Sequence, residues 1–99
     1  MKSYLISDNR DTQVGLRLAG IEGAYVQDLD NAKSVFFQAL NNNYGIIFLT
    51  EKIYHAIKED VIFHKEKSSL PLITVIPDRH GYDNNKDKIT DYIKESIGL

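Results

Sequence analysis

The chain is 99 residues long and 42% hydrophobic, with a formal net charge of −2 and no cysteine. This length predicts one domain with a modest core. The mixed charge argues against nucleic-acid binding, which requires a concentrated basic face. The absence of cysteine excludes a disulfide scaffold and a thiol nucleophile. The apolar runs are too short to span a bilayer or to form the core of a signal peptide. The absence of cysteine fits a cytosolic protein.

A strand, a polar turn and a helix are predicted in residues 2–21, and this is the usual opening of an α/β domain. Residues 4–6 form a short apolar run, which the polar residues 7–10 interrupt. Asp11 or Thr12 is expected to cap the helix by accepting an unpaired backbone N–H. The helix is expected to end at Gly20 or Gly23, where a left-handed conformation is easily adopted.

The first helix carries apolar residues on two sides. Val14, Leu18 and Ile21 lie at helical spacing and are predicted to face the core. Leu16 projects nearly opposite, so it is either an anchor for a partner or an incidental exposed leucine. Arg17 lies beside the predicted core stripe, from which it could reach a carboxylate of a partner or of this chain.

Three further strand–helix units follow. Residues 24–26 are predicted to form a strand, and Asp30 to cap a helix with apolar residues at positions 32, 35, 36, 39 and 40. The continuous apolar run 45–49 is typical of a central strand that is covered on both faces. Thr50 is expected to cap the third helix, which has apolar residues at 53, 54, 57 and 61. Residues 65–69 are predicted to be a loop, and residues 70–76 the fourth strand.

The last predicted helix spans about residues 86–97 and follows a long polar loop. Its apolar stripe is thin, so we expect it to dock less firmly than the others and to be free to move. The whole chain, 1–99, is predicted to be one α/β domain, with a sheet core in 1–77 and the loop and C-terminal helix in 78–99.

This alternation predicts a parallel sheet of four strands in the order 2-1-3-4, a shortened flavodoxin- or receiver-like fold flanked by helices. Functional sites in such folds lie outside the carboxyl ends of the strands. In this chain that rim carries Asp8, Arg10, Asp11, Thr50, Pro77, Asp78 and Arg79.

The sequence contains neither a complete phosphate-binding loop nor a phosphate-accepting receiver site. Gly15 and Gly20 have the first spacing of a P-loop, but Ile21 and Glu22 stand where Lys and Ser or Thr are required. A receiver needs an acceptor Asp after its third strand, where this chain has Thr50, and it also needs a fifth strand. Asp8 and Asp11 are interpreted as turn and capping residues, and the alternative interpretation is that they form a metal-binding pair.

Other catalytic groupings are also missing from the sequence. His55, His64 and His80 do not pair at a metal-binding spacing. Residues 68 and 69, both Ser, lack the surroundings of a nucleophile elbow. We therefore predict a module without catalysis, metal or cofactor. A binding module needs exposed apolar anchors, and Leu16 and Tyr82 are the candidates.

Three ordered stretches of the chain carry a family resemblance. They are Asp8-x-Arg10-Asp11-Thr12 followed by Gly15-Leu16-Arg17-Leu18-Ala19-Gly20-Ile21, then residues 44–51, then residues 71–77 leading to Gly81. On these stretches the chain resembles the F subunit of the bacterial and archaeal V-type (A/V-type) rotary ATPases. The family commonly has Gly-Phe-Arg-Leu-Ala-Gly in the first stretch. Leu16 replaces the Phe, which keeps an apolar side chain but changes its shape.

The resemblance implies a non-catalytic rotor subunit of the central stalk, without a cofactor. Such a protein binds the coiled-coil D subunit, rotates inside the catalytic A/B ring and connects it to the membrane rotor. It is peripheral to the membrane on the cytoplasmic side and helps couple ATP hydrolysis or synthesis to ion transport. As partner-binding candidates we take the first helix and the rim, namely Arg10, Asp11, Leu16, Arg17, Thr50, Asp78, Arg79 and Tyr82.

Two alternatives remain open from the residues. The first is a degenerate receiver-like signalling adaptor that switches by binding, without phosphorylation. The second is a small metal-dependent enzyme that uses Asp8 and Asp11.

Overall fold

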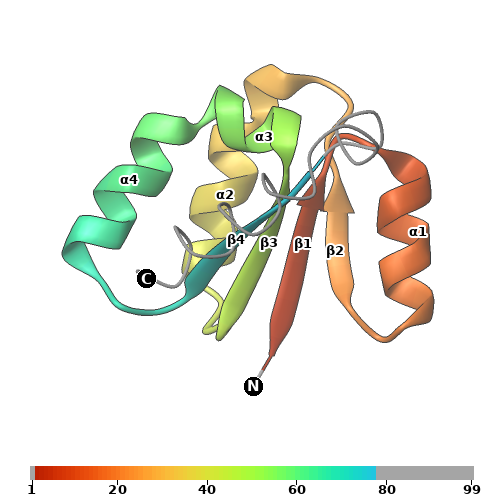
Figure 1. Ribbon diagram of the computed structural model, residues 1–99, viewed down its shortest axis with the longest axis horizontal. Helices are drawn as coiled ribbons and strands as arrows, with labels where there is room; N and C mark the ends of the chain where they lie inside the picture. Colours follow the sequence, from red (N-terminus) through yellow and green to blue (C-terminus); the bar gives the residue numbers. More distant parts are fainter. Residues whose placement is uncertain (1, 78–99) are drawn as a thin grey trace.

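Four parallel strands form the centre of the fold, in the order β2-β1-β3-β4 (Figure 1). The computed structural model describes residues 2–77. Its strands are β1 (Ser3–Ser7), β2 (Glu22–Tyr25), β3 (Ile46–Thr50) and β4 (Leu72–Ile76). The parallel pairing and the central positions of β1 and β3 confirm the prediction. The C-terminal helix and its loop, predicted in residues 78–99, lie outside the described residues.

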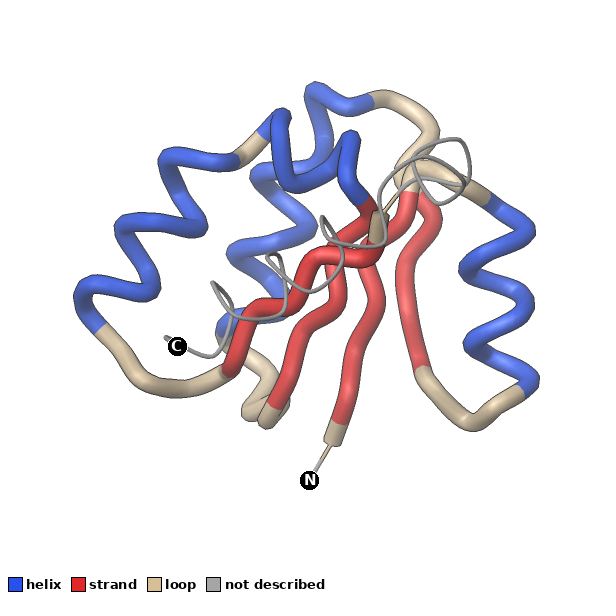
Figure 2. Tube along the Cα trace, viewed as in Figure 1, coloured by secondary structure: helices blue, strands red, loops and turns tan. Residues whose placement is uncertain are grey.

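The helices are divided between the two faces of the sheet. α1 (Arg10–Leu18) joins β1 to β2, and α2 (Ala32–Leu40) joins β2 to β3 after the short 3-10 turn η1 (Leu29–Asn31). α3 (Glu51–Ala56) and α4 (Lys58–Lys67) join β3 to β4. α2, α3 and α4 lie together, whereas α1 lies beside β2 at the other end of the sheet (Figures 1 and 2). Right-handed crossovers that run in opposite directions along the sheet place α1 on the opposite face.

The main core lies between one sheet face and helices α2, α3 and α4. The parallel register aligns Ile6 with Leu49 and Leu49 with Val75, so that these side chains form one row on that face. Burial of the apolar side chains there supplies most of the stabilising free energy. The cluster consists of Ile6, Val26, Ala32, Phe36, Ala39, Ile47, Leu49, Ile53, Tyr54, Ile57, Val61, Ile73 and Val75.

The orientation of α1 differs from the prediction. Val14 is 46% exposed and Leu18 is 86% exposed, and no residue of α1 is fully buried. Leu16, which was expected to point away from the core, is half-buried. The predicted core face of Val14, Leu18 and Ile21 is therefore wrong, since its first two members face outward.

The end of α1 explains this difference. Gly20 has φ +92°, and its N–H donates to the carbonyl of Arg17 at 3.0 Å, while the Ile21 N–H donates to the carbonyl of Leu16 at 2.9 Å. These two bonds form a Schellman motif, in which the side chains at the Leu16 and Ile21 positions commonly contact each other. Ile21 lies after the chain reversal, so its helical spacing from Val14 carries no information. Of the two predicted ends, Gly20 and Gly23, the structure confirms Gly20.

The helix starts also differ from the prediction. The Asn9 side chain caps α1 by accepting the Thr12 N–H at 3.0 Å, in place of Asp11 or Thr12. The Asp28 side chain caps η1 by accepting the N–H of Asp30, which was the predicted cap. Asn and Asp side chains favour these positions because they satisfy unpaired N–H groups. The cap of α1 therefore lies two or three residues before the expected one, whereas the N-cap position of α2 itself is Asn31, whose side chain makes no capping bond.

The connection from β3 to β4 contains two helices where one was predicted. The helix is interrupted at Ile57, whose φ of −125° is not helical, and a second helix, α4, then continues to Lys67. Most of the predicted loop at residues 65–69 therefore belongs to α4. Ile57 is buried, as are Ile53 and Val61 on either side of it, so the apolar spacing holds across the break.

Candidate functional site

The carboxyl ends of β1 and β3 meet at the pair Asp8 and Thr50. Thr50 Oγ1 donates to Asp8 Oδ1 at 2.6 Å and accepts the backbone N–H of Asp8 at 3.2 Å. Thr50 occupies the N-cap position of α3, but its side chain makes no capping bond there. The expected N-cap position is therefore confirmed, but the side-chain capping bond is absent because the hydroxyl bonds to Asp8 across the sheet instead.

This rim encloses very little space. The pocket at Asp8 and Thr50 has a volume of about 20 Å³, which is close to the room that one water molecule needs. It is lined by Asp8, Asn9, Thr12, Thr50, Glu51, Lys52 and Pro77. A receiver forms an acyl phosphate on a carboxylate, and the Thr50 hydroxyl cannot do so. Among residues 2–77, the pocket beside Asp8 and Thr50 is too small for a small-molecule substrate.

The turn after β1 is fixed by a buried hydroxyl. Ser7 Oγ donates to the carbonyl of Asn9 at 2.7 Å and accepts the Asn9 N–H at 2.9 Å. Ser7 is fully buried, and the turn that it holds positions Asn9 to cap α1. The rim of the sheet and the start of α1 are thus one hydrogen-bonded unit.

The other predicted site residues do not gather at the rim. Arg10 and Asp11 are exposed on the first turn of α1, and the Arg10 guanidinium lies over the Tyr25 ring, 5.4 Å from its centroid. Arg17 is exposed in the last turn of α1, whereas Leu16 is half-buried on the inner side. Asp78, Arg79 and Tyr82 lie outside the described residues, as does His80.

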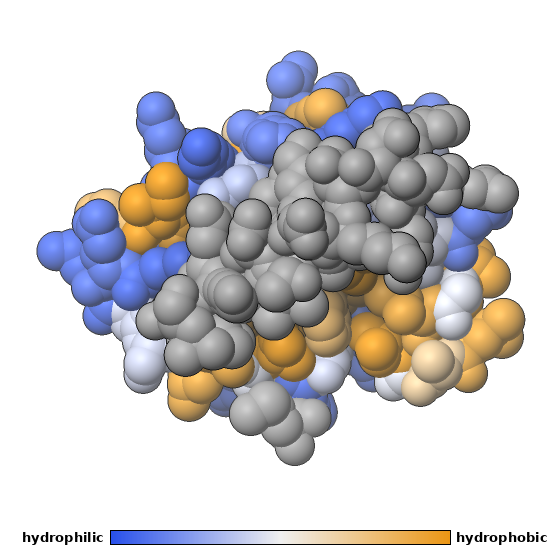
Figure 3. All heavy atoms as spheres, in the orientation of Figure 1, coloured by the Kyte–Doolittle hydropathy of each residue, from blue (hydrophilic) through white to orange (hydrophobic). Residues whose placement is uncertain are grey.

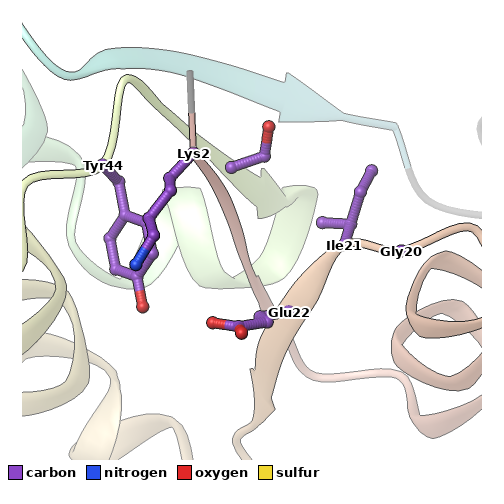
Figure 4. Close-up of a pocket in the computed structure, with 6 residues that line it drawn as sticks. Lys2, Gly20, Ile21, Glu22 and Tyr44 are labelled. Carbon is purple, nitrogen blue, oxygen red and sulfur yellow. The ribbon is translucent and has the colours of Figure 1, made fainter.

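A larger pocket lies at the opposite, amino end of the strands (Figure 4). Its volume is about 250 Å³, and it is lined by Lys2, Ser3, Gly20, Ile21, Glu22 and Tyr44. The Tyr44 ring stacks on Tyr4 with 4.7 Å between the centroids. Burial, with smaller contributions from Tyr44 and Glu22, raises the pKa of Tyr4 above its usual 10.0. No sequence pattern predicts this pocket, because three separate chain segments supply its residues.

The two described histidines differ in environment. His64 Nε2 lies 3.2 Å from the carbonyl oxygen of Pro71, and its ring stands edge-on to Phe36 with 6.3 Å between the centroids. His55 is exposed on α3. Within residues 2–77, no group of three or more His, Asp or Glu side chains is placed to hold a metal ion. No helix in the same range has the length and apolar character needed to cross a membrane.

Known proteins match the chain over nearly its whole length. The family described as ATP synthase (F/14-kDa) subunit matches residues 4–93. The A-type ATP synthase F subunit of Methanothermobacter thermautotrophicus is 36% identical over 93 residues, which is 92% of this chain and 88% of that protein. The corresponding A-type protein of Methanosphaera stadtmanae is 33% identical over 91 residues, 90% of this chain and 86% of that protein. The V-type ATP synthase F subunit of Clostridium botulinum is 26% identical over 99 residues, 99% of this chain and 95% of that protein.

Proposed function

The chain belongs to the ATP synthase (F/14-kDa) subunit family, and on that premise we propose that it is a non-catalytic central-stalk component of an A/V-type rotary ATP synthase. It binds the coiled-coil D subunit and turns with it inside the catalytic A/B ring. In this role it helps couple ATP synthesis or hydrolysis to ion transport, from a position on the cytoplasmic side that is peripheral to the membrane.

The family match over residues 4–93 is the observation that carries this proposal. The relatives named above are F subunits of A-type or V-type ATP synthases, and each is covered over at least 86% of its own length. The similarity therefore concerns the whole folded unit rather than one shared motif.

The chemistry of the rim supports a non-catalytic role. The buried Thr50 hydroxyl is engaged by Asp8, and the pocket beside the pair holds only about 20 Å³. A site for chemistry on a small molecule is normally a cleft of about 300–1,000 Å³ with convergent polar groups. A rigid sheet with exposed apolar side chains on its helices is better suited to docking than to turnover.

The direct test is co-expression of this chain with the coiled-coil stalk protein of the same organism, followed by size-exclusion chromatography with light scattering. We expect one peak with the mass of a one-to-one complex. Two separate peaks at micromolar concentration would overturn the proposal. A complex that forms but separates at moderate salt would also count against it, because an interface that transmits torque must be large and stable.

A receiver-like adaptor is the second candidate, favoured by the sheet order β2-β1-β3-β4 and by the position of Asp8 at the end of β1. The size-exclusion test described above separates this adaptor, which switches without phosphorylation, from the stalk component. Incubation with acetyl phosphate and Mg²⁺, followed by intact-mass measurement, tests for a phosphorylated receiver. We expect no mass change, because Thr50 stands where a receiver carries its acceptor Asp. The addition of a phosphoryl group would favour the receiver.

A further inference from the structure

The outer face of α1 exposes apolar side chains that the described fold does not cover. Leu18 is 86% exposed and Val14 is 46% exposed. The two lie one turn apart on the same side of the helix, since an α-helix has about 3.6 residues per turn. The space-filling view shows hydrophobic surface on the side of the molecule where α1 lies (Figure 3). We call Val14 and Leu18 the outer ridge of α1.

Gly15 lies beside the outer ridge and is not required by the packing of the described residues. A Cβ built on Gly15 meets no heavy atom within 4 Å, and its backbone is helical. Glycine is less favourable than alanine inside a helix because it loses more backbone freedom on folding. Because Gly15 has no side chain, the surface has a depression next to the outer ridge. The backbone of a partner protein can approach α1 closely at this depression.

Charged side chains flank the ridge. From helical geometry, Arg10 and Arg17 lie on one side of Val14 and Leu18, and Asp11 lies on the other side with Gly15. Arg17 is exposed, and within residues 2–77 the structure gives it no ion pair. A partner with an apolar stripe would therefore meet two guanidinium groups along one edge, which favours carboxylates at its matching positions.

The size of the surface decides between two kinds of occupant. α1 has nine residues, so it is only about 14 Å long. Pairing α1 with the α1 of a second copy would bury far less than the roughly 800 Å² per partner of a stable interface. A long helix can cross α1 and continue past its start toward Tyr25, which is exposed on the edge strand β2 and lies under Arg10.

We propose that the outer ridge of α1 docks a helix of the coiled-coil partner, with the partner backbone crossing close to Gly15 and its acidic side chains facing Arg10 and Arg17. The proposal rests on the proposed function and names the surface that carries it. It also changes the contact residues expected from the sequence, because Val14, Gly15 and Leu18 replace Leu16 at the centre of the interface.

The test measures the dissociation constant of the full-length chain for the coiled-coil stalk protein by titration calorimetry. Gly15→Leu fills the depression at Gly15, and Leu18→Gln replaces the larger apolar side chain of the outer ridge with a polar one. We expect each to weaken binding at least about tenfold. The midpoint of thermal unfolding of the isolated chain should not fall, because neither position packs against the described fold.

Phe63→Gln is the matched control, because Phe63 is also an exposed apolar residue, at 62%, but lies on α4 across the sheet. Its affinity should stay within about twofold of the unsubstituted chain. A charge test accompanies it: Arg17→Glu should weaken binding and reduce its dependence on salt.

The outcomes separate this inference from the function on which it rests. If the unsubstituted chain does not bind the stalk protein, the proposed function fails. If that chain binds, but Gly15→Leu and Leu18→Gln bind equally well, only the docking surface is wrong. A larger loss from Phe63→Gln than from Leu18→Gln would place the interface on α4 and overturn the inference. So would an isolated chain that elutes as a dimer and becomes monomeric with Leu18→Gln, because the ridge would then bind a second copy.

Discussion

Thr50 Oγ1 donates a 2.6 Å hydrogen bond to Asp8 Oδ1 and accepts the backbone N–H of Asp8 at 3.2 Å. The two residues are 42 positions apart in the chain and join the ends of β1 and β3. One hydroxyl thereby satisfies both a carboxylate and an amide at the rim. Thr50 stands where a receiver would carry its acceptor Asp, and its hydroxyl instead joins the ends of β1 and β3.

Thr50→Val should destabilise the fold by about 1–3 kcal/mol, because it preserves the shape but leaves the Asp8 N–H and carboxylate without their shared partner. Urea denaturation should show a lower midpoint with an unchanged m-value. Thr50→Ser keeps the hydroxyl and is the matched control, with a smaller loss. Equal losses for Val and Ser would mean that the methyl group matters rather than the hydrogen bonds.

The two faces of α1 should respond differently to an introduced carboxylate. Leu16→Asp should lower the free energy of unfolding by about 1–3 kcal/mol, because it moves a carboxylate into the half-buried side against the sheet. Val14→Asp should change it by less than about 0.5 kcal/mol, because the side chain already faces solvent. Circular dichroism during thermal unfolding measures both variants. A larger loss from Val14→Asp would restore the orientation that the sequence suggested.

Gly23→Ala should destabilise the sheet, because β1 and β2 approach closely at this residue. A Cβ at Gly23 would lie 2.7 Å from the carbonyl oxygen of Leu5 and 2.9 Å from its Cβ. Both contacts are too short, so the strands must shift at a cost of about 1–3 kcal/mol. Gly15→Ala is the control, with an expected gain of up to about 1 kcal/mol, because a Cβ there meets nothing. Equal changes in unfolding midpoint for the two variants would contradict this explanation.

The folded chain should lose stability at alkaline pH partly through Tyr4. Burial, together with Tyr44 and Glu22, raises the pKa of the Tyr4 phenol above 10.0. The unfolded chain then releases this proton at lower pH than the folded chain. The contribution of Tyr4 to the free energy of unfolding is fully present below the pKa that Tyr4 has in the unfolded chain. It is lost as the pH rises through the pKa that Tyr4 has in the folded chain.

Tyr4→Phe keeps the stack on Tyr44 and removes the phenol, so its stability should fall less steeply above pH 10.0. Glu22→Gln removes one of the smaller causes of the raised pKa and should show a weaker change in the same direction. Urea midpoints measured across this pH range give the slopes. Identical slopes for Tyr4→Phe and the unsubstituted chain would show that other groups carry the alkaline loss.

The sequence predicted the sheet well because its signals are local and strong. The run 46–49, Ile-Ile-Phe-Leu, lies in the central strand β3, where continuous apolar character is required on both faces. The strand–helix alternation and the handedness of crossovers then allow few topologies. The start of α1 was missed, because Asn9, Asp11 and Thr12 are all suitable caps and only the turn held by Ser7 selects Asn9.

By itself, the sequence determined the α/β architecture, the order of the strands and the family, because each depends on patterns that extend along the chain. Tertiary structure decided which side of α1 faces the sheet and what Thr50 does. The reversal at Gly20 brings Ile21 back beside Leu16 and turns Val14 and Leu18 outward. The pairing of β1 with β3 brings Thr50 to Asp8. Neither result follows from spacing along one element, because the first involves the chain reversal that follows α1 and the second involves a strand whose last residue lies 42 positions after Asp8 in the chain.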